Sequence, residues 1–236
     1  MQRLANCVAV IPCLNEGATL FPLVEAVLQH VSHVIVVDDG STDQTAAIAG
    51  EAGAEVLRHE KTRGKGAALN TGWRRAADQG FDWALTMDGD GQHAPDDIPA
   101  LLSCAMRGEV DLVAGNRMAN AGQMPWVRRQ VNQWMSRRLS HAAGLWLPDS
   151  QCGFRLMKLS AWSTVSIQTS HFEIESEVLL AFIEKGYAIE FVPVQCIYKS
   201  ERSKIHPVRD TWRWFRWWRR AGRRFSGARS SYSART

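Results

Sequence analysis

The feature that most constrains the fold of this chain is a regular alternation of short apolar runs with segments of helical length. The apolar runs of the first half lie at 8–11, 34–37, 55–58, 83–87 and 111–115. Segments with helical periodicity separate these runs and lie at 19–30, 42–52, 65–79 and 95–106. Short strands that alternate with helices form parallel sheets covered on both faces, so we predict an α/β fold with a mostly parallel sheet.

The second half of the chain is less regular. A stretch at 118–147 places apolar residues at three- and four-residue spacings among arginines, which predicts an amphipathic helical cover. A helix at 172–185 and a closing strand at 188–198 are expected to follow it. We expect the chain to consist of three parts, namely a single domain over 1–206, a basic, tryptophan-rich amphipathic helix over 207–225, and a disordered tail over 226–236.

Charge is distributed unevenly along the chain. Residues 207–236 contain nine arginines and one acid, Asp210, a net charge of +8, so the total of +4 leaves −4 for residues 1–206. Helical spacing would place four of the arginines on one stripe, namely Arg209, Arg213, Arg216 and Arg220. Tryptophan beside arginine suits the headgroup level of a membrane, so we predict a membrane-surface contact.

The same tail has other interpretations. Its tryptophans could pack on the body of the protein, on a second copy of the chain in a homo-oligomer, or on a membrane-protein partner. Nucleic acid is not expected as a partner, because the body is acidic and no recognisable nucleic-acid-binding module accompanies the tail.

Cysteine usage and hydropathy indicate a cytoplasmic protein. The five cysteines are scattered without the spacing of a metal site, as reduced thiols are. The apolar start of the chain is broken by Pro12 and is shorter than the core of a signal peptide. No run approaches the roughly 20 apolar residues of a transmembrane helix. We therefore expect a peripheral protein on the inner face of the membrane.

Acidic turns follow two of the predicted strands. Asp38 and Asp39 follow the run at 34–37, and Asp88-Gly89-Asp90 follows the run at 83–87. The carboxyl ends of parallel strands share one edge of a sheet, so these carboxylates should meet there. Hard oxygen ligands suit Mg²⁺ or Mn²⁺, which leave positions open for substrate phosphates. A solvated turn is the alternative for Asp88-Gly89-Asp90 alone, but gathered carboxylates without a cation would repel one another.

Three other segments have both a plain and a functional interpretation. Gly64-Lys65-Gly66 precedes a predicted helix and could place Lys65 near a phosphate, although the Walker spacing is absent. His93 is interpreted as a turn residue rather than as a ligand. Glu173, Glu175 and Glu177 are interpreted as solvated or as orienting an acceptor loop, with a catalytic base as the alternative.

Six short motifs occur in order along the chain. They are IPCLNEG (11–17), VVDDGSTD (36–43), GKGAALNTG (64–72), MDGDGQH (87–93), GNR (115–117) and QCGFR (151–155). Together they resemble the family 2 glycosyltransferases, in the branch of dolichol-phosphate mannose synthase and bacterial polyprenyl-phosphate sugar transferases. The resemblance implies a GT-A fold, a nucleotide-sugar donor and a divalent metal, Mg²⁺ or Mn²⁺.

The resemblance also implies which residues form the site. The nucleotide-sugar pocket would use Pro12, Leu14, Glu16, Val37, Asp39 and, at the phosphates, Lys65, Asp88 and Gly89. The metal would be held by Asp88, Asp90 and Gln92. The reaction would be carried by Asp88, Asp90, Arg117, Arg202 and Lys204. Arg117 would face a substrate phosphate, and Lys204 matches the lysine of the family's acceptor loop. The arginine that the family pattern expects six residues before that lysine is Tyr198 here.

These features predict an inverting transfer of a hexose from a GDP- or UDP-linked sugar to a polyprenyl phosphate. A lipid phosphate is already anionic near pH 7, since its second pKa is about 6, and needs no general base. Transfer to a hydroxyl of a lipid-linked or cell-surface glycan is the alternative and would require a carboxylate base. A non-catalytic nucleotide-sugar-binding scaffold is the alternative of another class, and Asp39, Asp88 and Asp90 argue against it because binding alone has less need of a metal.

Overall fold

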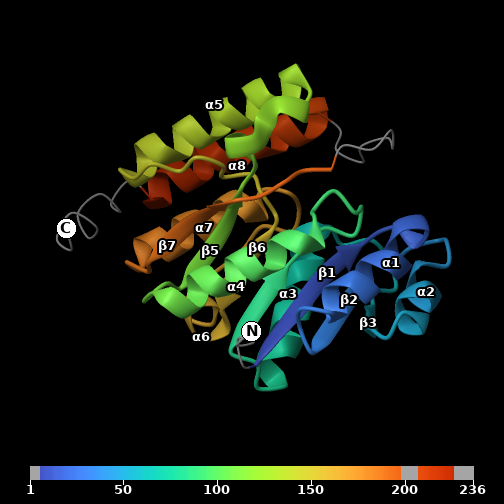
Figure 1. The fold of residues 1–236 in the computed structure, drawn as a ribbon. Helices are drawn as coiled ribbons and strands as arrows, with labels where there is room; N and C mark the ends of the chain where they lie inside the picture. The colour runs from blue at the N-terminus through green and yellow to red at the C-terminus, as the bar shows by residue number, and fades with distance from the viewer. Residues whose placement is uncertain (1–5, 198–206, 226–236) are drawn as a thin grey trace.

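The protein is built on one seven-stranded sheet, and the computed structural model describes residues 6–197 and 207–225 (Figure 1). The strands are β1 (Cys7–Cys13), β2 (His33–Asp38), β3 (Glu55–Arg58), β4 (Trp83–Thr86), β5 (Leu112–Asn116), β6 (Arg155–Lys158) and β7 (Ile189–Pro193). Their spatial order is β3-β2-β1-β4-β6-β5-β7. All neighbours pair in parallel except β6, which runs antiparallel to β4 and β5. The prediction of a mostly parallel α/β sheet is confirmed.

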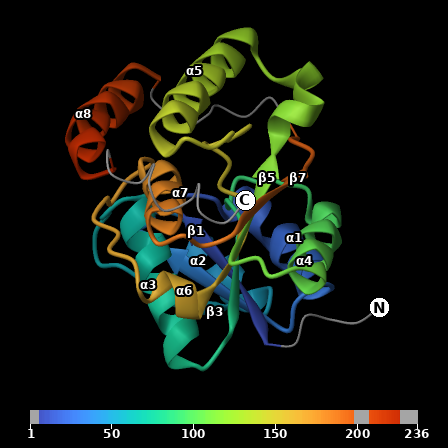
Figure 2. The same ribbon diagram turned by 90° about the vertical axis from the view of Figure 1, so that its left-hand side faces the viewer.

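Helices cover both faces of this sheet. They are α1 (Gly17–Leu28), α2 (Thr45–Glu51), α3 (Lys65–Asp78), α4 (Ile98–Arg107), α5 (Trp126–Ala143), α6 (Leu159–Trp162), α7 (Ile174–Glu184) and α8 (Pro207–Phe225), with short 3₁₀ turns at Pro95–Asp97 and Arg117–Gln123. One core joins α1, α2 and α4 to the sheet, and a second core joins α3, α6 and α7 to its other face (Figure 2). The central strands β1, β2, β4 and β5 are mostly apolar because both of their faces are buried, whereas the edge strands β3 and β7 are only partly buried.

The helices α5 and α8 form an outer layer beyond the sheet and its helices, and they lie side by side in both ribbon views. A third apolar cluster joins them to α7, with Met135 and Leu139 from α5, Leu180 from α7 and Trp214 from α8. The predicted helical stretch at 118–147 is therefore divided into a 3₁₀ turn and α5. Pro125 lies at the break, directly before the first residue of α5.

Two elements were not predicted, and one was predicted too long. The strand β6 and the helix α6 have only four residues each, and the RLMK sequence of β6 carries charge at both ends, so neither shows a periodic pattern. The closing strand predicted over 188–198 covers only Ile189–Pro193. Beyond Pro193 the chain leaves β5 and pairs briefly with His93 through Cys196.

The antiparallel strand β6 brings a further loop to the functional edge of the sheet. Arg155, the first residue of β6, lies opposite Thr86, the last residue of β4. The segment before β6 therefore meets the Asp88-Gly89-Asp90 turn that follows β4. Arg155 is buried there, and its guanidinium donates to the carbonyl oxygens of Ser150, Cys152 and Glu175.

The tryptophans of α8 divide between the protein body and its surface. Trp214 is 2% exposed, stacks on Trp218 with ring centroids 5.5 Å apart, and donates its indole N–H to Ser176 Oγ at 2.9 Å. Trp212 and Phe215 are 60% and 46% exposed. The alternative of packing on the body thus holds for Trp214. In the part of the chain that the structure describes, no helix is both long and apolar enough to cross a bilayer.

Replacing Trp214 with alanine should destabilise the protein by about 3–5 kcal/mol, because it opens a cavity among α5, α7 and α8 and removes one of the two donors to Ser176 Oγ. Replacing its exposed neighbour Phe215 with alanine is the matched control and should change stability by less than about 1 kcal/mol. Urea denaturation of the two variants measures the difference. Equal losses would mean that α8 does not pack as described.

Candidate functional site

The site lies at the carboxyl edge of β1, β2 and β4, where three turns meet. Pro12 ends β1 beside Cys13, and Leu14 and Glu16 follow in the turn to α1. Gly89 lies against this turn, because a Cβ on it would stand 2.5 Å from Cys13 Sγ and 3.4 Å from the Glu16 side chain. Thr19 Oγ1 also donates to the Gly89 carbonyl at 2.7 Å. Only glycine therefore allows the turn after β4 to sit this close to the turn after β1.

Asp39 organises the turn after β2 and the approach to α3. Its carboxylate accepts from the backbone N–H groups of Arg63 (2.9 Å) and Gly64 (2.7 Å) and lies 2.7 Å from His59 Nδ1. The side chain is buried. It fixes the loop that delivers Lys65, the first residue of α3, to the edge of the sheet.

Lys65 joins two carboxylates at the centre of the edge. Its Nζ is 2.6 Å from Asp88 Oδ1 and 2.6 Å from Glu175 Oε1, and its side chain is largely buried. Burial favours neutral Lys65, but the two carboxylates outweigh burial and raise its pKa above the ordinary lysine value. Burial also opposes ionisation of Asp88, yet Lys65 lowers the Asp88 pKa to about 2. The centre is therefore a charged carboxylate–ammonium–carboxylate cluster.

Gly153 permits this cluster to form. A Cβ at Gly153 would stand 3.0 Å from Lys65 Nζ and 3.2 Å from Asp88 Oδ1. The residue belongs to the segment before β6, so this segment lies against Lys65 and Asp88.

Asp90 is the carboxylate beside this cluster. Burial and the neighbouring charge of Asp88 raise the pKa of Asp90, and its Oδ1 accepts from the Gln92 N–H at 3.0 Å. Within the described residues no group of three or more His, Cys, Asp or Glu side chains could hold a metal ion. Two neighbouring carboxylates nevertheless fit Mg²⁺ or Mn²⁺, because such ions take few protein ligands and complete their shell with water and substrate phosphate. A cation would also relieve the repulsion between Asp88 and Asp90.

Arg117 is held in a buried ion pair. Its Nε and Nη2 bind the two oxygens of Asp149 at 2.8 and 2.9 Å, and its backbone N–H donates to the same carboxylate. Asp149 is fully buried, and its charge raises the pKa of Arg117 against the effect of burial. Arg117 was predicted to contact a substrate phosphate. In this structure its Nε and Nη2 atoms already donate to Asp149.

His93, which was predicted to be a turn residue rather than a ligand, follows the turn after β4 and is buried. Its ring stacks on Phe154 with centroids 5.2 Å apart, and its Nδ1 accepts from the Asp88 N–H at 3.2 Å. Burial lowers its pKa to about 4, so the ring is neutral at pH 7 and can accept this hydrogen bond. The interpretation as a simple turn residue was incomplete, because the ring supports the backbone of Asp88.

The sequence of residues 8–165 matches the model of a protein family described as glycosyl transferase family 2. The chain belongs to this family. It is therefore a glycosyltransferase, and the family 2 motifs named above occupy the edge of the sheet just described. The predicted resemblance is confirmed.

Two curated relatives are similar to this chain over a longer stretch than the family model covers. A UDP-N-acetylglucosamine–dolichyl-phosphate N-acetylglucosaminyltransferase of Methanococcus voltae is 31% identical over 212 residues, covering 80% of this glycosyltransferase and 84% of the relative. An undecaprenyl-phosphate mannosyltransferase of Micrococcus luteus is 34% identical over 206 residues, covering 81% and 83%. These relatives place the chain in the predicted branch of the family.

A solved structure confirms the GT-A fold. Glucosyl-3-phosphoglycerate synthase of Mycobacterium tuberculosis, in complex with Mn²⁺, UDP and phosphoglyceric acid, superposes with a TM-score of 0.70 at 21% identity. The match covers 89% of this glycosyltransferase and 75% of that chain. At this identity the likeness establishes the fold alone.

The predicted site residues of the glycosyltransferase differ in burial, and the structure does not describe all of them. Val37 is fully buried between the sheet and α3, and a Cβ on Gly72 would stand 3.1 Å from its side chain, so this side chain packs against α3 and the place of Val37 in the nucleotide pocket stays a prediction. Arg202 and Lys204 lie outside the described residues. Pro12, Leu14 and Glu16 are half-buried in the turn after β1.

Two of the three glutamates were misjudged as solvated. Glu175 and Glu177 are buried. Glu175 binds Lys65, while Glu177 accepts from the N–H groups of Gln168 and Thr169 and from Thr169 Oγ1. Glu173 is half-buried, and burial raises its pKa.

Three of the predicted residues have side-chain partners that the motifs did not indicate. His59, Asp149 and Glu175 each bind a residue that the motifs had identified, namely Asp39, Arg117 and Lys65. Asp149 lies two residues before the motif QCGFR (151–155), and this proximity was a usable signal. His59 carries no comparable signal, because it follows an unremarkable short strand.

Proposed function

We propose that this glycosyltransferase moves a hexose from a nucleoside-diphosphate sugar to a polyprenyl phosphate by inversion. The observation that carries the proposal is that Lys65, Asp88 and the neighbouring Asp90 lie together at the carboxyl edge of the sheet, in a chain whose relatives are named for sugar transfer to dolichyl and undecaprenyl phosphates. These three side chains offer one cation and two carboxylates to a diphosphate and its metal.

The donor would lie along the turns after β1 and β2. Asp39 would receive the nucleoside together with Pro12, Leu14 and Glu16, and Lys65 would bind the diphosphate beside Gly89. Asp88 and Asp90, with Gln92, would hold Mg²⁺ or Mn²⁺, the ions present in the solved synthase complexes with UDP. The ion would neutralise the charge of the departing diphosphate.

The acceptor would enter from the side of Arg202 and Lys204. A lipid phosphate supplies its own nucleophilic oxygen, so the chain needs to neutralise and position it rather than to deprotonate it. A hydroxyl acceptor is the second candidate, and half-buried Glu173 with its raised pKa would be the base for it. In either case Arg117 would contribute by holding the segment around Asp149 in place.

We also propose that the chain acts as a peripheral protein on the cytoplasmic face of a membrane. Residues 1–206 would form the catalytic unit and 207–225 the membrane-facing helix, with exposed Trp212 and Phe215 entering the headgroup layer. A second copy of the chain or a membrane-protein partner would dock on the same helix.

A direct test supplies the purified protein with Mn²⁺, a panel of UDP- and GDP-linked hexoses, and a short-chain polyprenyl phosphate. The proposal is supported if the nucleoside diphosphate is released and mass spectrometry detects the polyprenyl phosphate carrying the hexose. If the hexose is transferred only to a glycan hydroxyl, the polyprenyl-phosphate acceptor is rejected in favour of the hydroxyl acceptor. Donor binding without any turnover would favour the scaffold alternative.

Replacing Lys65 with methionine should raise the KM for the donor roughly 10- to 100-fold, since a hydrogen bond to a charged group contributes about 1.5–3 kcal/mol. Steady-state kinetics at saturating acceptor measure this change. Lys61→Met is the matched control, because Lys61 is an exposed lysine four residues earlier. An unchanged donor KM in the Lys65 variant would exclude its diphosphate contact.

Replacing Trp212 and Phe215 together with serine should weaken binding to phospholipid vesicles about tenfold or more, because two large apolar side chains no longer leave water. Vesicle sedimentation measures the affinity. The control replaces Phe21 and Met106 with serine, since these residues are exposed to a similar degree on α1 and α4. A comparable loss in both variants would argue against a membrane-facing α8.

A further inference from the structure

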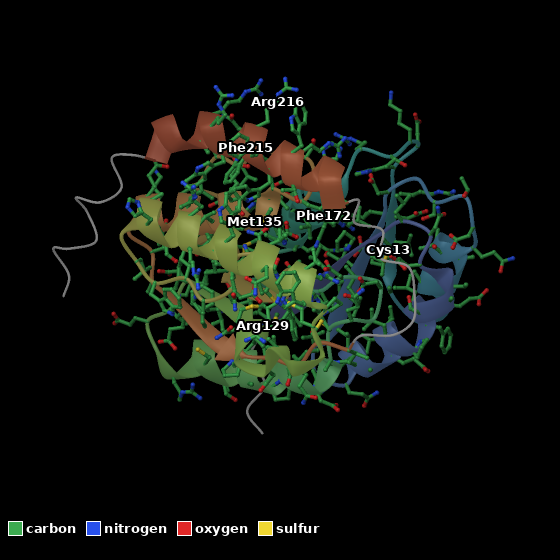
Figure 3. All side chains as sticks on the ribbon, turned by 90° about the horizontal axis from the view of Figure 1, so that it is seen from above. Cys13, Arg129, Met135, Phe172, Phe215 and Arg216 are labelled. Carbon is green, nitrogen blue, oxygen red and sulfur yellow. The ribbon has the colours of Figure 1, made fainter. Side chains whose placement is uncertain are left out.

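A cavity of about 730 Å³ lies between α8 and the segment 168–173 that leads into α7. The α8 wall is formed by three arginines and two tryptophans, namely Arg213, Arg216, Arg220, Trp212 and Trp217. Arg216 points from the side of α8 that faces away from α5 (Figure 3). Three of the four arginines of the predicted stripe therefore line a concave surface, and the side chain of the fourth, Arg209, lies outside the described part of the structure.

The charge of this cavity suits an anion. Two acids, Glu173 and Glu177, lie on the wall opposite the arginines. Glu177 Oε2 already accepts three hydrogen bonds, from the N–H groups of Gln168 and Thr169 and from Thr169 Oγ1. Arg216 and Arg220 are exposed within the cavity, and guanidinium groups bind phosphate oxygens through two parallel hydrogen bonds.

The cavity also offers an apolar surface beside these charges. Trp212 is exposed, and the Arg216 guanidinium lies 5.6 Å from the centre of its ring. Trp217 continues the same wall. Arginine paired with tryptophan on one helix face matches a ligand with a phosphate head and an apolar body at a membrane surface.

The cavity lies apart from the carboxylates that would hold the donor and its metal, and Glu173, the candidate base for a hydroxyl acceptor, stands on its wall. Asp39, Asp88 and Asp90 do not line it, and Glu175 faces the other way, toward Lys65. Its wall nevertheless contacts the donor side, because the Ala67 N–H of α3 donates to the Ser170 carbonyl at 3.2 Å. An occupant would therefore hold the donor edge close to the bilayer without being the phosphate that reacts.

We propose that this cavity binds the phosphate headgroup of an anionic membrane phospholipid through Arg216 and Arg220, with the lipid body against Trp212 and Trp217. The proposal rests on the membrane placement in the proposed function and adds the lipid class and the residues that select it. An anionic phospholipid is favoured over the acceptor lipid because the cavity contains none of the donor-edge carboxylates.

The test compares vesicles of phosphatidylcholine with vesicles that also contain phosphatidylglycerol. Arg216→Gln with Arg220→Gln should lose roughly 30-fold in affinity for the phosphatidylglycerol vesicles, while its weak affinity for pure phosphatidylcholine stays the same. The matched control, Arg74→Gln with Arg107→Gln, removes the same charge from exposed arginines on α3 and α4. Equal losses in the two variants, or no loss in either, would overturn the proposal. Near-ultraviolet circular dichroism of the tryptophans reports whether α8 stays packed.

Competition identifies the source of the phosphate. Inorganic phosphate at constant ionic strength and a short-chain polyprenyl phosphate are each expected to leave the vesicle-bound fraction of the wild-type protein unchanged. Displacement by either would assign the cavity to a free phosphate or to the acceptor and overturn the phospholipid site. Arginine-dependent vesicle binding in a protein that transfers no sugar to polyprenyl phosphate would reject the proposed function and leave this site standing.

Discussion

Replacing Asp90 with asparagine should lower the rate of sugar transfer about 100- to 1,000-fold while the protein remains folded. The loss is expected because the asparagine amide carries no charge for the cation on the donor diphosphate. Its amide oxygen can still accept from the Gln92 N–H, so the turn should keep its shape. Initial rates at saturating Mn²⁺ and donor measure the effect.

The stability of the Asp90→Asn variant should not fall along with its transfer rate. Burial and Asp88 raise the pKa of Asp90 in the folded protein, so its ionised form opposes folding above that pKa. Without metal at pH 7, Asp90→Asn should therefore melt at the same temperature as the wild type or slightly above it. Asp96→Asn, in an exposed acid six residues later, should change neither quantity. Full activity in the Asp90 variant would reject the metal role.

Replacing Arg117 with methionine should destabilise the protein by about 3–5 kcal/mol. In the wild type the Arg117 guanidinium donates two hydrogen bonds to Asp149, and the variant leaves this fully buried carboxylate without its ion-pair partner. Urea denaturation with donor titration separates this loss from any loss of donor binding.

A second substitution makes this result specific. The double variant Arg117→Met with Asp149→Leu replaces the whole ion pair with apolar side chains and should recover most of the lost stability. If the single variant is as stable as the wild type but binds donor weakly, Arg117 contacts phosphate as the resemblance implies and the ion pair opens on binding. Recovery in the double variant with unchanged donor affinity assigns Arg117 a structural role.

The sequence predicted the parallel half of the fold because its strands are buried on both faces. Runs such as 34–37 have no polar alternation and are bounded by turns, so they are distinct from the helices between them. The strand β6 escaped prediction because its Arg155 is satisfied by three carbonyl oxygens inside the protein. Such a strand is stabilised by contacts with neighbouring segments, and its own sequence shows no strand pattern.

Site residues that directly follow a strand could be predicted from the sequence. Site residues that come from a distant part of the chain could not. Asp39 and Asp88 follow β2 and β4 directly, and topology alone brings them to one edge. Glu175 reaches Lys65 from α7, 110 positions later in the chain, and no local pattern encodes that contact. The burial of Val37 likewise follows from the packing of α3 rather than from its place at a strand end.

The position of β6 between β4 and β5 also governs the order in which the chain can fold during synthesis. The strands β1 to β4 can pair as soon as they leave the ribosome, but β5 has no partner until residues 155–158 arrive. Until then the buried edge of β4, with Trp83 and Leu85, stays open to other chains. A nascent or truncated chain that ends before Arg155 is therefore the form most exposed to aggregation and most dependent on chaperones.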